Sequence, residues 1–265
     1  MLLYDITSVE NAFDTIYHLT GVSIQNINQF ISQSIITDEF CLDGTNLTGA
    51  NFIDKFNISS DIHDTLLICA LHYTSNNDNS CAIKKYGLRD LKFSLTEDTP
   101  LKLFLADNGF NFDIINHTMY YNGRSYNIFY ERQVSIVDNP LQGIARKIFY
   151  DNGLSCFLYL KDITRYLGNV HKRPEILYNI DQFAPKLNLS YKWMKQCKSY
   201  EIKFMTSFNQ FEKYTFMDDD RSTLEALLDK ALCVAGNMVC GEAFGYLKPL
   251  SIVEPEQILQ YKELS

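Results

Sequence analysis

A His-Tyr-Thr triplet at positions 72–74 is the clearest group of polar residues that could do chemistry. It follows six consecutive apolar residues, 66–71, a run that is typical of a strand covered on both faces. Because side chains alternate along a strand, His72 and Thr74 should point to the same side. Such a pair can orient a polar ligand, whereas a histidine at a strand end can also be a hydrogen-bonded structural residue. The triplet leaves both interpretations open.

The residues after the triplet predict a loop and a short helix. Ser, Asn and Asp dominate positions 75–80, and Ser80 is a candidate N-cap for a helix through Ile83. Gly87 would end that helix, because glycine adopts the left-handed conformation of a C-cap at little cost.

This strand, triplet and helix ending in Gly87-Leu88 resemble the first motif of the ADP-ribosyltransferase-like superfamily. That superfamily includes poly-ADP-ribosyl polymerases, DNA-modifying toxins and RNA 2'-phosphotransferases. The resemblance implies an α+β fold with a central split β-sheet, peripheral helices and NAD as substrate. It also implies that His72 contacts the ribose on the nicotinamide side and Thr74 the carboxamide, with Tyr73, Gly87 and Leu88 completing the NAD site.

The same resemblance implies an aromatic wall and a catalytic glutamate further along the chain. Tyr159, in an apolar strand pattern, is the candidate for stacking on nicotinamide, and core packing is the alternative. Glu242 precedes a late strand and is the candidate catalytic carboxylate, with Glu201 and Glu212 as substitutes. A salt-bridged surface carboxylate is the alternative for all three.

The pattern of elements predicts two parts. Residues 1–60 should form a helical N-terminal appendage, and residues 61–265 the transferase-like domain, with a hairpin insertion near 99–132. Within the insertion, Asn122-Gly123 between aromatic runs indicates a type I′ hairpin turn.

Four later elements are expected. Residues 175–180 and 199–205 have strand patterns, and Ser222 with Glu225 forms a capping box for a long helix. Pro255-Glu256 favours the start of another helix.

Three segments resemble the AbiGi family of abortive phage-resistance proteins. They are residues 134–141, 153–161 and 174–178, which would correspond to that family's Val-Ser-Phe-x-Asp-Ile-Pro-Leu-like segment, its Gly-containing strand and its Pro-Val-Leu-Tyr-like strand. This resemblance implies a role in antiviral defence.

Charge and composition exclude several classes of protein. With 46% hydrophobic residues, the chain has enough apolar surface for a packed core. Its net charge of -8 argues against passive binding to bulk nucleic acid, although a local basic groove would remain compatible. No phosphate-binding glycine loop, signal peptide or membrane-spanning run is expected, so the prediction is a cytoplasmic protein.

The seven cysteines and five histidines show no metal-ligand spacing, so we expect reduced core thiols and no metal site. Cys197, flanked by Lys195 and Lys198, is a weaker candidate for a nucleophile with a lowered pKa.

These patterns lead to two hypotheses from different classes. The first is an NAD-dependent ADP-ribosyltransferase that acts as a toxin or phage-defence effector on a nucleic-acid or protein acceptor. The second is a catalytically inactive transferase-like protein that binds or senses a partner, as an antitoxin or immunity component would. The partners considered are a nucleic-acid or protein acceptor and a cognate antitoxin or phage protein. An RNA phosphotransferase is a third, lesser alternative, because Arg89 is the one arginine close to the motif in sequence.

Overall fold

The computed structural model describes residues 1–38, 41–43, 46–59, 65–133, 139–151, 153–166, 168–216, 222–239 and 241–264. The described chain is a mixed α+β protein that contains antiparallel strand pairs and a parallel pair of residues 2–4 with residues 66–68. It divides into two compact units, and the chain passes between them several times. The first unit contains residues 1–71, 155–162 and 203–247, and the second contains residues 72–154, 163–202 and 248–265.

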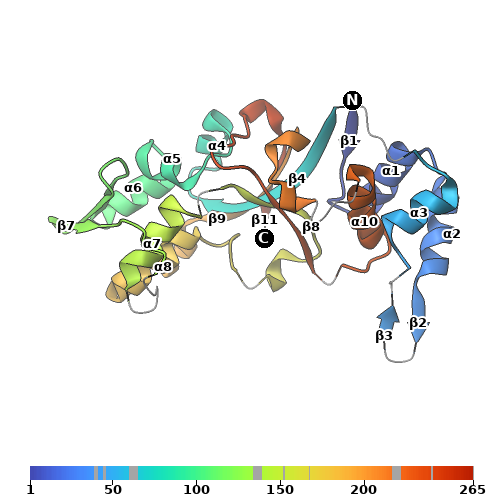
Figure 1. Cartoon of the computed structure of the whole chain (residues 1–265). Helices are drawn as coiled ribbons and strands as arrows, with labels where there is room; N and C mark the ends of the chain where they lie inside the picture. Colours follow the sequence, from blue (N-terminus) through green and yellow to red (C-terminus); the bar gives the residue numbers. More distant parts are fainter. Residues whose placement is uncertain are drawn as a thin grey trace. The chain divides into compact units, whose positions relative to one another are not determined.

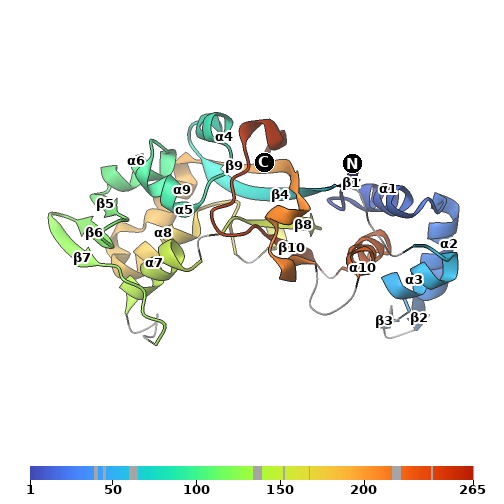
Figure 2. The same cartoon turned by 45° about the horizontal axis from the view of Figure 1, so that its top comes forward.

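The first unit is built from N-terminal helices and several strands or parts of strands. Its elements are β1 (Leu2–Tyr4), α1 (Val9–Thr20), α2 (Ile24–Ser34), β2 (Ile36–Asp38), β3 (Cys41–Asp43), α3 (Gly49–Phe56), the first half of β4 (Leu66–Asn76), β8 (Ser155–Leu160), the end of β9 (Lys198–Ser207), η3 (Phe208–Gln210), η4 (Lys213–Thr215), α10 (Thr223–Ala235) and β10 (Glu242–Tyr246). In both views α1 and α3 lie beside α10 (Figures 1 and 2).

The helices predicted as a separate N-terminal appendage therefore pack on a helix from the C-terminal part of the chain. The Tyr4 hydroxyl donates to the backbone oxygen of Leu227 at 3.0 Å, and the Gly49 N–H donates to Asp229 Oδ1 at 2.5 Å. The compact units follow a different division from residues 1–60 and 61–265.

The second unit holds the remaining elements. They are the second half of β4, α4 (Cys81–Tyr86), α5 (Leu91–Thr96), α6 (Pro100–Asp107), β5 (Phe110–Asp113), β6 (Thr118–Tyr121), β7 (Arg124–Asn127), α7 (Pro140–Phe149), η1 (Ile163–Arg165), α8 (Glu175–Phe183), η2 (Pro185–Leu187), α9 (Leu189–Gln196), the start of β9, η5 (Pro255–Gln257) and β11 (Ile258–Leu264). Its core joins α6, α7, α8 and α9 to the β5–β7 sheet through buried residues that include Phe104, Met119, Ile144, Leu177 and Trp193.

The largest sheet follows the strand order β10-β8-β4-β9-β11, and β1 pairs with β4 outside this path. Leu2 pairs with Leu66 in a parallel register, whereas β4 and β8 are antiparallel with Leu71 opposite Phe157. The predicted apolar run forms the first half of β4, but the strand continues through the polar triplet to Asn76.

Several local predictions are confirmed. Ser222 caps α10 by accepting the Glu225 N–H, which is the serine half of the predicted capping box. Strand β9 alternates buried and half-buried residues along the predicted strand. Asn122 and Gly123 both have positive φ, 49° and 76°, as a type I′ turn requires.

Two predicted elements are wrong. Residues 175–180 form helix α8 instead of a strand, with Ile176, Leu177 and Ile180 on one buried face. After Pro255 there is one 3-10 turn and then strand β11, because Ile258 leaves the helical region. The predicted AbiGi-like segment 134–141 lies largely outside the described residues, which resume at Asn139.

Candidate active site

The His-Tyr-Thr triplet lies inside β4, and its side chains divide between the two faces of that strand. His72 and Thr74 are half-buried on one face, whereas Tyr73 and Ser75 are buried on the other. The prediction that His72 and Thr74 share a side is therefore consistent with the strand geometry. These two side chains are the accessible part of the triplet.

Tyr73 connects β4 to a glutamate on β9. Its hydroxyl donates to Glu201 Oε2 at 2.8 Å, and Lys262 Nζ on β11 lies 3.4 Å from Glu201 Oε1. Burial raises the pKa of Tyr73 well above its usual range, and the hydrogen bond to the Glu201 carboxylate raises it further. Tyr73 therefore remains a neutral hydrogen-bond donor across the physiological pH range.

Ser75 is held by the single tryptophan of the chain. Trp193 Nε1 on α9 donates to Ser75 Oγ at 2.7 Å, and both groups are buried. The contacts of Tyr73 and Ser75 hold one face of β4 and thereby fix the orientation of the other face, which carries His72 and Thr74. No pattern in the sequence signals this pairing directly, although a lone tryptophan in an amphipathic segment often marks a core contact.

The helix after the triplet ends where the motif predicts. Gly87 has φ 74° and ψ -164°, so it has a positive φ but not the left-handed helical conformation expected for the C-cap. A Cβ atom at this position would lie 1.9 Å from the backbone oxygen of Val253. Its neighbour Leu88 is buried and forms an antiparallel bridge with Val253. Ser80 occupies the N-cap position of α4 without a side-chain cap, and Asp78 instead accepts the Ala82 N–H at 2.7 Å.

Tyr159 and Glu242 lie on neighbouring strands of the first unit. Glu242 is the first residue of β10 and pairs with Leu160, while Tyr159 pairs with Ala243. Because directly paired residues project to the same face, Glu242 and Tyr159 project to opposite faces. Glu242 is exposed, and Tyr159 is 7% exposed.

The register also locates Glu242 along the sheet. Leu71 pairs with Phe157, whereas Glu242 pairs with Leu160, three residues away on β8. Three residues of an extended strand span about 10 Å. Glu242 therefore pairs with β8 three residues beyond Phe157, the residue that pairs with Leu71.

The substitute glutamates have different surroundings. The Glu201 side chain is 17% exposed and already has two partners. Glu212 is half-buried, and its backbone N–H donates to the Tyr246 oxygen at 2.8 Å at the far end of β10.

The hypothesis of an activated thiol at Cys197 is wrong. Burial raises the pKa of Cys197 to about 12, and the nearby Asp78 carboxylate adds to the effect, so the thiol is protonated at neutral pH. Among the described residues, no group of three or more His, Cys, Asp or Glu side chains could hold a metal ion. No helix in the described part of the chain is long and apolar enough to cross a membrane.

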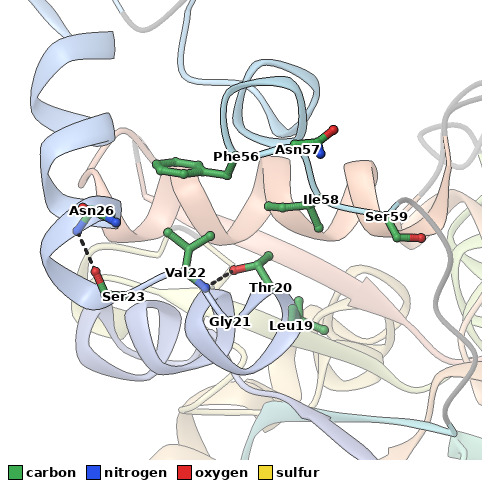
Figure 3. Close-up of a pocket in the computed structure, with 10 residues that line it drawn as sticks. All are labelled: Leu19, Thr20, Gly21, Val22, Ser23, Asn26, Phe56, Asn57, Ile58 and Ser59. Carbon is green, nitrogen blue, oxygen red and sulfur yellow. Dashed lines mark hydrogen bonds between the residues drawn. The ribbon is translucent and has the colours of Figure 1, made fainter.

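One surface hollow in the first unit is lined by none of these residues. It has a volume of about 730 Å³ and lies between the α1–α2 turn and the end of α3 (Figure 3). Its walls include Thr20, whose hydroxyl donates to the Ile16 oxygen and accepts the Val22 N–H. The sequence contains a second His-x-Thr, His18 to Thr20, which forms the last turn of helix α1.

Comparison of the chain with protein-family models, curated proteins and solved structures finds no match. Function is therefore inferred from the residues and geometry described above.

Proposed function

We propose that this protein is an NAD-dependent ADP-ribosyltransferase that acts as a toxin or phage-defence effector on a nucleic-acid or protein acceptor. One observation carries most of the weight: the strands bearing the triplet, Tyr159 and Glu242 are the consecutive neighbours β4, β8 and β10. The resemblance implies a histidine and a glutamate on strands of one sheet, and β4 and β10 both belong to this sheet. The helix after β4, ended by Gly87 and followed by buried Leu88, agrees with the same motif.

The accessibility of the predicted residues supports a division of roles toward NAD. His72 and Thr74 are half-buried, so they can contact a ligand, and Glu242 is exposed. Tyr73, Leu88 and Tyr159 are buried. The proposal therefore assigns the contacts to NAD to His72, Thr74 and Glu242, and it assigns no direct contact to these three buried side chains.

The proposed reaction breaks the bond between the ribose C1' and the nicotinamide nitrogen. Nicotinamide leaves with the bonding electron pair, the acceptor nucleophile forms a new bond to C1', and the acceptor loses a proton. Positive charge develops on the ribose as the bond breaks, and a preorganised carboxylate stabilises it. Glu242 has this role in the proposal, while His72 orients the ribose and Thr74 the carboxamide.

The five described cysteines that remain free support action in a reducing compartment such as the cytoplasm. They are Cys69, Cys81, Cys156, Cys197 and Cys233. Free thiols persist there because cellular reductants oppose disulfide formation.

A second candidate is a transferase-like protein that binds or senses a partner without catalysis. Two observations favour it: Glu201 is occupied by Tyr73 and Lys262, and Glu242 is offset by three residues from the position opposite Leu71. Such a protein would keep the fold but would release no nicotinamide.

Nicotinamide release from NAD by the purified protein, with and without added cell lysate, separates the two candidates. The transferase proposal predicts release by the wild type and its loss in His72→Ala. His18→Ala is the matched control, because His18 belongs to the other His-x-Thr of the chain and lies in α1. No release under either condition, together with no NAD binding by calorimetry, would overturn the transferase proposal.

A further inference from the structure

A cluster of aromatic rings lies on the surface of the second unit, beside the β5–β7 sheet. The Phe129 ring lies 5.4 Å from His117, which lies 4.2 Å from Phe149, and the Tyr130 ring lies 5.5 Å from Tyr150. Phe129 is 55% exposed and Tyr150 is 52% exposed, whereas the other three rings are half-buried. We call these five residues the aromatic platform.

Hydrogen bonds hold the backbone that carries Phe129 and Tyr130. Gln142, a buried residue of α7, donates to the Phe129 backbone oxygen at 3.1 Å and accepts the Glu131 N–H at 2.8 Å. The adjacent Ile128 is buried, and its N–H donates to the His117 oxygen at 2.8 Å. These contacts fix the segment that presents Phe129 and Tyr130, so a ligand would bind without the entropic cost of ordering it.

Three basic side chains lie on or next to the elements that carry the platform. The Arg132 guanidinium lies 5.4 Å from the centre of the Tyr150 ring and donates to the Tyr150 hydroxyl at 3.0 Å. Lys92 Nζ lies 5.4 Å from the centre of Phe149. Arg146 is exposed on α7, one turn before Tyr150.

Nearby acidic groups only partly cancel this charge. Asp151 and Glu175 share one cation, Lys147, so one of their two negative charges is not balanced. Glu131 is exposed beside the platform. The four cations Arg132, Lys92, Arg146 and Lys147 thus exceed these three carboxylates by one charge, on a chain whose net charge is -8.

We propose that the aromatic platform binds single-stranded nucleic acid, with bases stacking on Phe129 and Tyr150 and phosphates contacting Arg132 and Lys92. Stacking rings combined with cations are the general means by which proteins hold single strands. The inference rests on the proposed transferase function in one respect: it names single-stranded nucleic acid as the acceptor class.

The test is fluorescence anisotropy with labelled 12-nucleotide single-stranded RNA and DNA, and with the matching duplexes, at low salt and without NAD. The wild type should bind single strands more tightly than duplexes. The double variant Phe129→Ala/Tyr150→Ala should bind single strands at least about tenfold more weakly, because two stacking contacts are lost. Arg132→Gln should weaken binding and reduce its dependence on salt.

Two further variants control for folding and for unspecific loss of aromatic surface. Phe129→Leu/Tyr150→Leu keeps apolar side chains and should still lose affinity, with an unchanged melting temperature. Tyr17→Ala removes an exposed tyrosine from α1 in the first unit and should bind like the wild type.

Absence of single-strand binding by the wild type, or equal binding by the double variant, would overturn the inference. The inference would also be overturned if the wild type bound another protein but no nucleic acid, and if the platform variants lost that protein. That result would favour a protein partner. Binding of single strands by the wild type without any nicotinamide release would reject the transferase proposal while leaving the nucleic-acid surface intact.

Discussion

Glu242 in the first unit and Glu201 in the second are both strand carboxylates, but their surroundings differ. Glu242 begins β10 and is exposed, and among the described residues its carboxylate has no hydrogen-bond or ion-pair partner. Glu201 lies within β9, where neighbouring strands supply the Tyr73 hydroxyl and Lys262. The difference indicates that a carboxylate within a sheet is engaged by the fold, whereas one at the start of an edge strand remains able to meet a ligand.

The two units also differ in how they use ion pairs on the same face of β9. In the first unit, Lys203 Nζ donates to Asp5 Oδ2 at 2.5 Å, and the two side chains are 19% and 15% exposed. In the second unit, Lys262 is 56% exposed beside Glu201. The Lys203–Asp5 pair should therefore contribute more to the free energy of unfolding than the Lys262–Glu201 pair.

The largest expected effect concerns glycines with similar φ angles in the two units. Gly87→Ala should lower the free energy of unfolding by about 3 kcal/mol or more, because it adds backbone strain to a clash with Val253. Gly21 has φ 72°, and no atom lies within 4 Å of the place that an added methyl group would take, so Gly21→Ala should cost only about 1–2 kcal/mol. Urea unfolding measures both, and equal losses would contradict the described contact.

Lys203→Met should have the next largest effect. It leaves Asp5 largely buried without its cation, and we expect a loss of about 2–3 kcal/mol, below the roughly 3–5 kcal/mol of a fully buried pair. Lys262→Met should cost less than about 1 kcal/mol, because that lysine is mostly exposed. The comparison would fail if Lys262→Met were the more damaging of the two in denaturant unfolding.

The smallest expected effect is on acid stability. Burial raises the pKa of the Asp5 carboxyl, but hydrogen bonds from Lys203 and Thr7 outweigh it and hold the pKa below its usual value. A lowered folded-state pKa gives stability that is complete above the unfolded-state pKa of about 3.9 and is lost as pH falls through the folded value.

Asp5→Asn should therefore flatten the fall in unfolding free energy below about pH 4 relative to the wild type. The change should be smaller than the effect of Lys203→Met at neutral pH. Asp98→Asn, at an 85% exposed side chain, is the control and should leave the pH profile unchanged. A profile for Asp5→Asn parallel to the wild type would show that Asp5 has no such role.

Local patterns predicted much of the secondary structure. The apolar run of β4, the Asn122-Gly123 turn and the Ser222 cap each depend on residues close in sequence, so their physics can be read directly. The helix α8 was missed because Ile176, Leu177 and Ile180 suit a buried strand as well as one face of a helix, and packing against α7 decides between them.

The site was less predictable for a physical reason. The Tyr73–Glu201 hydrogen bond joins residues 128 positions apart, and it depends on the register between strands that no local pattern specifies. Sequence patterns identified both residues, but they assigned Tyr73 to NAD binding and Glu201 to a substitute catalytic role. The three-residue offset of Glu242 from the position opposite Leu71 is likewise a consequence of register.

The most direct measurement is the rate of nicotinamide release per folded molecule for Glu242→Gln and Glu201→Gln, each compared with the wild type. Both substitutions keep the side-chain shape and remove the charge. If the exposed carboxylate stabilises the developing positive charge, Glu242→Gln should lower the rate at least about a hundredfold. Glu201→Gln should leave the rate within about threefold of the wild type, because Glu201 contacts Tyr73 and Lys262 and has no role toward NAD in the proposal. Its effect on stability should also be small, because Lys262 is mostly exposed. A hundredfold loss in Glu201→Gln with an unchanged rate in Glu242→Gln would contradict this account.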